Sequence, residues 1–260
     1  MGHIRLGVLP HSLKWQQVAA LLTGGATNAD VFAAAAIAAE RDLAQASNDP
    51  VFVEAVRLLL MVPFAARSDG FAGALRSLGL NVSTAPDVLD ICAAASARLD
   101  EVARSRGRRS DFSELAGRAL IATLSTQIGD RLPGLFETSA ADVQAAVRSL
   151  SYARGVADLT RGYFGRLLSD CLSSWLDRTL STKLGLGKRF DRAADRSSFE
   201  LALNRYSSEA TRIINEFAPG WYGKRLHEDG TITSERAAAF AAVAFKKIGE
   251  ELRRKRGADA

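Results

Sequence analysis

Cysteine and histidine are scarce in this chain. Its two cysteines, Cys92 and Cys171, show no CxxC spacing, which argues against both a disulfide framework and a zinc knuckle. The three histidines, His3, His11 and His227, do not make a metal set by their spacing. We therefore expect no metal or other cofactor. The sparse, isolated cysteines favour a reducing compartment, the cytoplasm.

Long hydrophobic runs are also missing. The longest, VFAAAAIAA and LLLMVPFAA, reach about half the length of a membrane-spanning helix. The N-terminal sequence MGHIRLGVLP lacks the apolar core of a signal peptide, and Leu6 stands where a myristoylation signal needs Ser or Thr. These absences predict a soluble cytoplasmic protein with no membrane partner.

Familiar catalytic motifs are absent as well. The chain has no GxSxG, HExxH or GxGxxG pattern, and Thr182 stands where a phosphate-binding loop around LGLGKRF needs its first glycine. That segment is interpreted as a glycine-rich turn ending a long helix. Asp191 and Asp195 have the spacing of paired carboxylates, but the arginines alternating with them indicate a solvated ion-pair segment. We assign no catalytic residue from these patterns.

Aliphatic and basic residues dominate what is present. Hydrophobic residues make up 47% of the chain and aromatics only 7%, so thin Ala and Leu contacts between helices should build the core. The 34 basic against 29 acidic side chains give a formal charge of +5, which permits an anionic partner without requiring one. Arginine supplies most of the positive charge and suits carboxylate or phosphate.

Helix start signals recur along the sequence. Each pairs a capping side chain with a first-turn proline or carboxylate, and they lie at Asp49 and Pro50, Thr84 and Asp87, Ser139 and Asp142, and Ser197 and Glu200. With the 3.6-residue periodicity they predict about ten helices, at residues 12–23, 28–46, 50–62, 69–78, 85–105, 111–127, 139–150, 153–183, 197–216 and 234–255. The long helix 153–183 should run through the core, and its glycines indicate close packing of a crossing helix or a kink.

The fold class that follows is all-α, with one multi-helix, bundle-like domain over residues 1–260. An alternative division at RSRGRRS gives an N-terminal helical layer, 1–107, and a C-terminal layer, 110–260. Near the N-terminus, HIRLGV alternates apolar and polar residues and predicts one short strand or an extended arm. Because a lone strand cannot pair with itself, we expect this arm to reach another copy or another protein.

The segment EFAPGWYGKRLHEDGTITSER carries the turn chemistry of a helix connection. Pro219 and Gly220 are expected to end the helix 197–216, and Thr233 to begin the next. The connecting loop is then about sixteen residues long, which exceeds most helix connections. Aromatic and charged side chains gather there, and we predict that the loop contacts a partner through Trp221, Tyr222, Lys224, Arg225 and His227.

The chain has two clusters of basic residues, and the four consecutive basic side chains near the C-terminus exceed what a helix end requires. As candidate phosphate contacts the two clusters comprise Arg104, Arg106, Arg108 and Arg109 in the mid-chain turn, and Arg253, Arg254, Lys255 and Arg256 near the C-terminus.

Three functions remain open at this point. The leading hypothesis is a non-enzymatic helical scaffold or accessory subunit that binds a protein partner or self-assembles within a multi-component bacterial complex. The alternative is a nucleic-acid-associated protein that uses the arginine clusters, in a phage-defence or toxin-linked module. The third is an enzyme with a site assembled from the long helix and the Trp221 loop, which requires a polar-lined pocket beside Tyr163 or Trp175.

Overall fold

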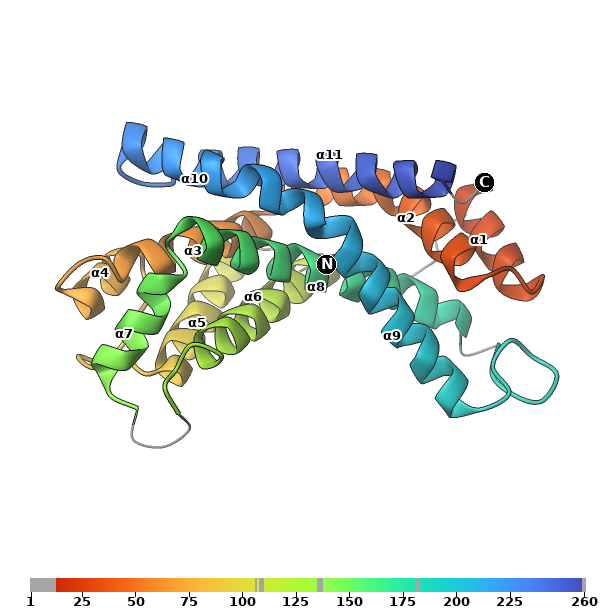
Figure 1. The fold of residues 1–260 in the computed structure, drawn as a ribbon, viewed down its shortest axis with the longest axis horizontal. Coiled ribbons are helices and arrows are strands. Elements are labelled where there is room, and N and C mark those ends of the chain that lie inside the picture. The colour runs from red at the N-terminus through yellow and green to blue at the C-terminus, as the bar shows by residue number, and fades with distance from the viewer. Residues whose placement is uncertain (1–12, 106, 108–109, 135–137, 181–182, 259–260) are drawn as a thin grey trace.

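The computed structural model describes residues 13–105, 107, 110–134, 138–180 and 183–258 (Figure 1). Over these ranges the chain is helical and contains no β-strand, which confirms the all-α prediction. The elements are α1 (Leu13–Thr23), α2 (Asn28–Ala46), α3 (Pro50–Ala65), α4 (Phe71–Ser77), α5 (Val88–Ser105), α6 (Asp111–Gly129), α7 (Ala140–Ser149), α8 (Ala153–Leu180), α9 (Ala193–Ala210), the 3-10 turn η2 (Thr211–Ile213), α10 (Ile214–Asp229) and α11 (Ser234–Ala258). The predicted arm, HIRLGV, lies outside the described residues.

Local capping chemistry explains where several helices begin. Asp49 accepts hydrogen bonds from the amides of Val51 and Phe52, with Pro50 in the first turn of α3. At the start of α7 the predicted Ser139 and Asp142 pair forms a reciprocal capping box, and Thr233 accepts from the Arg236 amide at the start of α11.

Two predicted caps are wrong. Asp87, rather than Thr84, caps α5, because its carboxylate accepts from the Asp90 amide at 2.7 Å. α9 begins at Ala193, one turn before the predicted cap at Ser197. In both segments a hydroxyl residue matches the capping motif, but a nearby carboxylate accepts the backbone hydrogen bond instead. Asp87 accepts from the Asp90 amide, and Asp195 accepts from the Arg192 amide.

The largest departure from the prediction follows α9. The predicted helix 197–216 ends earlier, and η2 and α10 replace the predicted loop, so Pro219 lies inside a helix. A proline inside a helix costs one backbone hydrogen bond, but α10 buries Ile214, Ala218 and Tyr222. Packing therefore overrides the proline signal, and the chain turns only at Gly230, which has φ 66° and donates to the Leu226 carbonyl.

The central helix is α8, which packs against α6, α9 and α10. Its predicted course through the core is confirmed, because Tyr163, Phe164, Leu167, Cys171 and Leu172 are all fully buried. α3 packs against α5 and α6 on one side and α11 on the other, while α11 lies along α2 at the top of Figure 1.

An aromatic cluster joins the early and late helices. The Phe52 ring lies 6.3 Å from that of Phe164 and 5.4 Å from that of Phe245, and the last two are 5.6 Å apart. Edge and offset contacts of this kind add to the burial of the rings. The cluster ties α3, α8 and α11 into one core.

Glycines of α8 lie at close approaches; Gly165 meets another helical element, as predicted, whereas Gly155 does not. A Cβ on Gly155 would lie 2.4 Å from the Ser149 carbonyl oxygen, and one on Gly165 would lie 3.1 Å from the Thr211 hydroxyl. Gly155 meets the turn that precedes α8, whereas Gly165 meets the start of η2. No helix in the described ranges has both the length and the apolar character needed to cross a membrane.

Candidate functional site: a polar groove between α6, α8 and α9

An open groove with a volume of about 720 Å³ lies between the end of α6, the middle of α8 and the face of α9. Its lining is mainly polar and consists of Gln127, Asp130, Arg131, Asp158, Arg161, Gly162, Gly165, Arg166, Asn204 and Ser208. Because Gly162 and Gly165 carry no side chain, the groove reaches the backbone of α8. A volume of this size suits a small ligand or a few residues of a peptide.

One arginine of the groove is held in place. Arg131 Nη1 donates to the carbonyl and the side-chain oxygen of Gln127, both at 2.9 Å. Its Nη2 donates to Asp158 at 3.3 Å, across from α6 to α8. These contacts fix the guanidinium plane at one end of the groove.

The other two arginines keep most of their donors available. Arg161 Nη2 has only long contacts, 3.4 Å each, with the carbonyl and hydroxyl oxygens of Ser208. Arg166 is exposed and forms no hydrogen bond or ion pair with any residue of the described chain. Its electrostatic neighbour is Asp170, where burial raises the carboxyl pKa and Arg118 and Arg166 oppose that rise.

Amide groups complete the lining. Asn204 Oδ1 accepts a hydrogen bond from the Ser169 hydroxyl at 2.5 Å, so the Asn204 amide nitrogen keeps both of its donors. Arginines outnumber aspartates in the lining by three to two, and one of the aspartates is paired with Arg131. The arrangement can therefore donate several hydrogen bonds to a carboxylate or phosphate.

The groove also bears on the enzyme hypothesis. That hypothesis requires a polar-lined pocket beside Tyr163 or Trp175, and Gly162 of the lining is adjacent to Tyr163. The Tyr163 side chain itself is fully buried, and its hydroxyl has no hydrogen-bond partner in the described structure. The groove offers donors for recognition, while the tyrosine is part of the core.

The predicted loop residues take separate places on α10. The Trp221 ring packs on Phe240, with centroids 4.8 Å apart, and Tyr222 is buried, which raises its pKa. Lys224 and Arg225 approach Glu228 at 3.8 and 2.6 Å. His227 is exposed. The description of this segment as a loop was wrong, and its contact with a partner stays a prediction.

The arginine clusters are described only in part. Arg104 is exposed and donates to the Asp100 carbonyl at 3.3 Å, whereas Arg106, Arg108 and Arg109 lie outside the described residues. Phosphate binding by this cluster stays a prediction.

In the C-terminal cluster, Arg253 forms an ion pair with Glu40 of α2, and Arg254 pairs with Glu251 at 3.5 Å. Lys255 and Arg256 continue the helical backbone of α11, and their side chains lie outside the described residues. Arg253 therefore contacts another helix of the chain, and phosphate contact by this cluster also stays a prediction.

The two aspartates with the spacing of paired carboxylates have structural partners. Asp191 accepts a hydrogen bond from the Gly187 amide, and Asp195 accepts one from the Arg192 amide. Both carboxylates therefore bind backbone amides rather than the side chains of the arginines beside them in the sequence. Within the described residues, no three His, Cys, Asp or Glu side chains are placed to hold a metal ion. His3 and His11 lie outside these residues.

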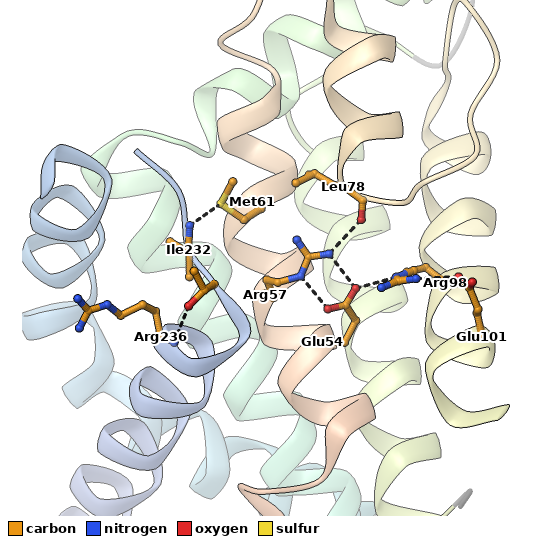
Figure 2. A network of polar contacts seen from close by, with 9 residues as sticks. Glu54, Arg57, Met61, Leu78, Arg98, Glu101, Ile232 and Arg236 are labelled. Carbon is orange, nitrogen blue, oxygen red and sulfur yellow. Dashed lines mark hydrogen bonds and ion pairs between the residues drawn. The ribbon is translucent and has the colours of Figure 1, made fainter. Parts of the chain in front are cut away.

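An ion network around the buried Glu54, which the sequence analysis missed, joins α3 to α5 (Figure 2). Glu54 of α3 accepts from Arg57 at 2.7 and 2.8 Å and from Arg98 of α5 at 2.9 Å, and Arg57 also donates to the Leu78 carbonyl. Arg98 reaches Glu101 at 2.8 Å. Burial raises the pKa of Glu54, but the two arginines outweigh it, so the pKa lies below its ordinary value. With both arginines partnered, the network acts as a cross-link between helices.

Comparison with protein-family models, curated proteins and solved structures found no match.

Proposed function

We propose that the protein is a helical binding subunit that holds an acidic segment of a protein partner in the groove between α6, α8 and α9. One observation carries the proposal: Arg131, Arg161 and Arg166 line the same open groove, and Arg166 has no hydrogen-bond partner in the described chain. In this role the protein is an accessory subunit of a multi-component complex in the bacterial cytoplasm.

The chemistry of the lining favours carboxylates presented by a peptide. A guanidinium group forms two parallel hydrogen bonds with a carboxylate, and such charge-assisted bonds are stronger than neutral ones. Gln127 and Asn204 supply amide groups that match peptide N–H and C=O groups.

The acidic residues of the groove disfavour a nucleic acid. Asp130 and Asp158 interrupt the arginines, and they repel a strand that carries a phosphate at every step. A peptide with acidic residues spaced by neutral ones avoids that repulsion.

The test is fluorescence anisotropy with a labelled peptide of alternating Glu and Ser, against the same peptide with Gln in place of Glu. We expect the wild-type chain to bind the Glu peptide, and Arg166→Ala to weaken binding about tenfold, the loss of a charge-assisted hydrogen bond. The matched control is Arg205→Ala, an exposed arginine of α9 that pairs with Glu209 and does not line the groove.

Two results would overturn the proposal. One is equal affinity for the Glu and Gln peptides, or for wild type and Arg166→Ala. The other is tighter binding of a single-stranded oligonucleotide than of the Glu peptide, when Arg166→Ala leaves that binding unchanged and deletion of the residues after Leu252 abolishes it. This outcome would assign the function to the C-terminal basic cluster.

A further inference from the structure

Residues 183–192, within the connection between α8 and α9, form a closed and anchored loop. The Phe190 amide donates to the Lys183 carbonyl at 3.1 Å, and the Gly185 amide donates to the Phe190 carbonyl at 2.9 Å. Gly185 and Gly187 have φ values of 125° and 72°, in the region that favours glycine. The loop is therefore shaped by its own hydrogen bonds.

Side chains of the same loop fasten it to α1 and α2. Lys183 Nζ donates to the Thr23 hydroxyl at 2.8 Å, and Arg189 donates to the Asn28 side chain at 2.9 Å. Phe190 is buried, with its ring 5.3 Å from that of Phe199. The base of the loop thus belongs to the body of the protein.

Leu186 stands at the tip of this loop and is 96% exposed. Lys188 and Arg192 nearby are also exposed, and so is Asp191, which accepts from the Gly187 amide. The exposed charged groups near the leucine are therefore two basic and one acidic. An apolar side chain held out by an ordered loop can insert into a pocket on another surface, and its burial there removes apolar area from water.

The chain itself contains such a pocket. A groove of about 600 Å³ between α5 and α6 has Leu99, Ala103 and Ile121 in its lining. Asp100 and Glu114 also line it, together with one arginine, Arg118. The groove is therefore apolar with an acidic majority among its charged groups, which complements the Leu186 loop.

Two other grooves with apolar residues fit less well. The groove between α1 and α2 is lined by Lys14 and contains no carboxylate. The groove between α2 and α11 is lined by Lys246, and its Glu40 is already paired with Arg253. Charge complementarity selects the α5–α6 groove.

We infer that Leu186 of one copy docks in the α5–α6 groove of a second copy, with Lys188 facing Glu114. This contact uses surfaces separate from the polar groove and goes beyond the proposed function. Because the loop and the groove are different surfaces, the contact is heterologous. Repeated contacts build a ring or a chain of copies, unless two copies each dock their loop in the groove of the other.

The first test is sedimentation velocity of the full chain over a range of concentrations. We expect wild type to self-associate, and Leu186→Ser to raise the dissociation constant at least about tenfold, because the burial of a leucine side chain is lost. The control is Leu201→Ser, which removes a leucine of α9 that is 70% exposed and does not line any of these grooves. All these positions are exposed, so the melting temperatures should match that of wild type.

A charge reversal gives a sharper test. Lys188→Glu and Glu114→Lys should each remain monomeric, because each places like charges across the contact. Mixing the two variants restores the contact in two combinations: the loop of Lys188→Glu meets the groove of Glu114→Lys, and the unchanged Lys188 of the second variant meets the unchanged Glu114 of the first. The mixture should therefore associate again, with the two variants alternating.

Disulfide trapping checks the geometry. Leu186→Cys mixed with Ser96→Cys, a residue of the groove, should give a crosslinked heterodimer under mild oxidation. The native Cys92 and Cys171 are buried, so they do not compete.

Three results would overturn the inference: a wild-type chain that stays monomeric, association that Leu186→Ser leaves unchanged, or a charge-reversal mixture that does not associate. Binding of a monomeric wild-type chain to vesicles of anionic phospholipid, lost in Leu186→Ser, would assign the loop to a membrane surface instead.

Discussion

Ser113 donates a hydrogen bond to Asp49 at 2.7 Å, although the two residues are 64 positions apart. Ser110 donates to the same carboxylate oxygen at 2.9 Å, while the other oxygen accepts from the amides of Val51 and Phe52. One carboxylate therefore caps α3 and holds the start of α6, so the two helices begin at a shared point.

Removing this carboxylate should loosen both helices. We expect Asp49→Ala to lower the free energy of unfolding by about 2–3 kcal/mol, the sum of a lost cap and lost hydrogen bonds to a charged group. Asp49→Asn keeps an oxygen that can cap α3 and should lose less. Urea denaturation measures both variants, and equal losses would contradict the contribution of the cap.

The Glu54 network gives a second prediction. Glu54→Gln leaves Arg57 and Arg98 without their shared anion, and we expect a loss of roughly 2–4 kcal/mol in urea denaturation because a half-broken buried ion pair is costly. Glu101 pairs with Arg98 at the surface, where its side chain is 61% exposed. Glu101→Gln should therefore change stability by less than about 0.5 kcal/mol, and losses of similar size would contradict a special role for Glu54.

The same glutamate should make stability depend on pH. Its pKa is lower in the folded chain than the ordinary value of 4.5, so its contribution is complete above that value and is lost as the pH falls through the folded pKa. Denaturation of wild type and Glu54→Gln from pH 7 downward should show the gap between them narrowing in acid. A gap that stays constant or widens would contradict the lowered pKa.

Two glycines form a matched pair. A Cβ on Gly155 would lie 2.5 Å from the Leu150 Cα, whereas nothing lies within 4 Å of one on Gly223 inside α10. We expect Gly155→Ala to destabilise the protein by about 1–3 kcal/mol through overpacking. Gly223→Ala should stabilise it by up to about 1 kcal/mol, since alanine favours helix. Thermal unfolding measures both, and a shift of the same sign would contradict the packing at Gly155.

Sequence periodicity and caps were enough to predict most of the fold. The all-α class, the caps at Asp49 and Ser139 and the buried course of α8 all follow from local signals. Pro219 was misleading, because a local helix-breaking signal competes with the burial of Ala218 and Tyr222, which depends on tertiary contacts. The division of the chain into two layers stays a prediction.

The candidate site was harder to predict. The polar groove combines Arg131, Arg161 and Asn204 from three helices, and no local spacing reveals that they meet. The signal available was RGYFGR, residues 161–166, in which each helix glycine lies beside an arginine. Glu54 offered another signal, as a lone acid in the apolar run PVFVEAVRLLLMVPF.

The position of α11 has a consequence for how the chain is made. Its Phe245 stacks on Phe52, so the cover of α3 is synthesised almost two hundred residues after α3 itself. During translation the apolar faces of α2 and α3 leave the ribosome before α11, which packs on both, has been synthesised. Native packing around α3 is thus completed only after α11 has been synthesised, and until then the apolar face of α3 is open to aggregation or to chaperone binding.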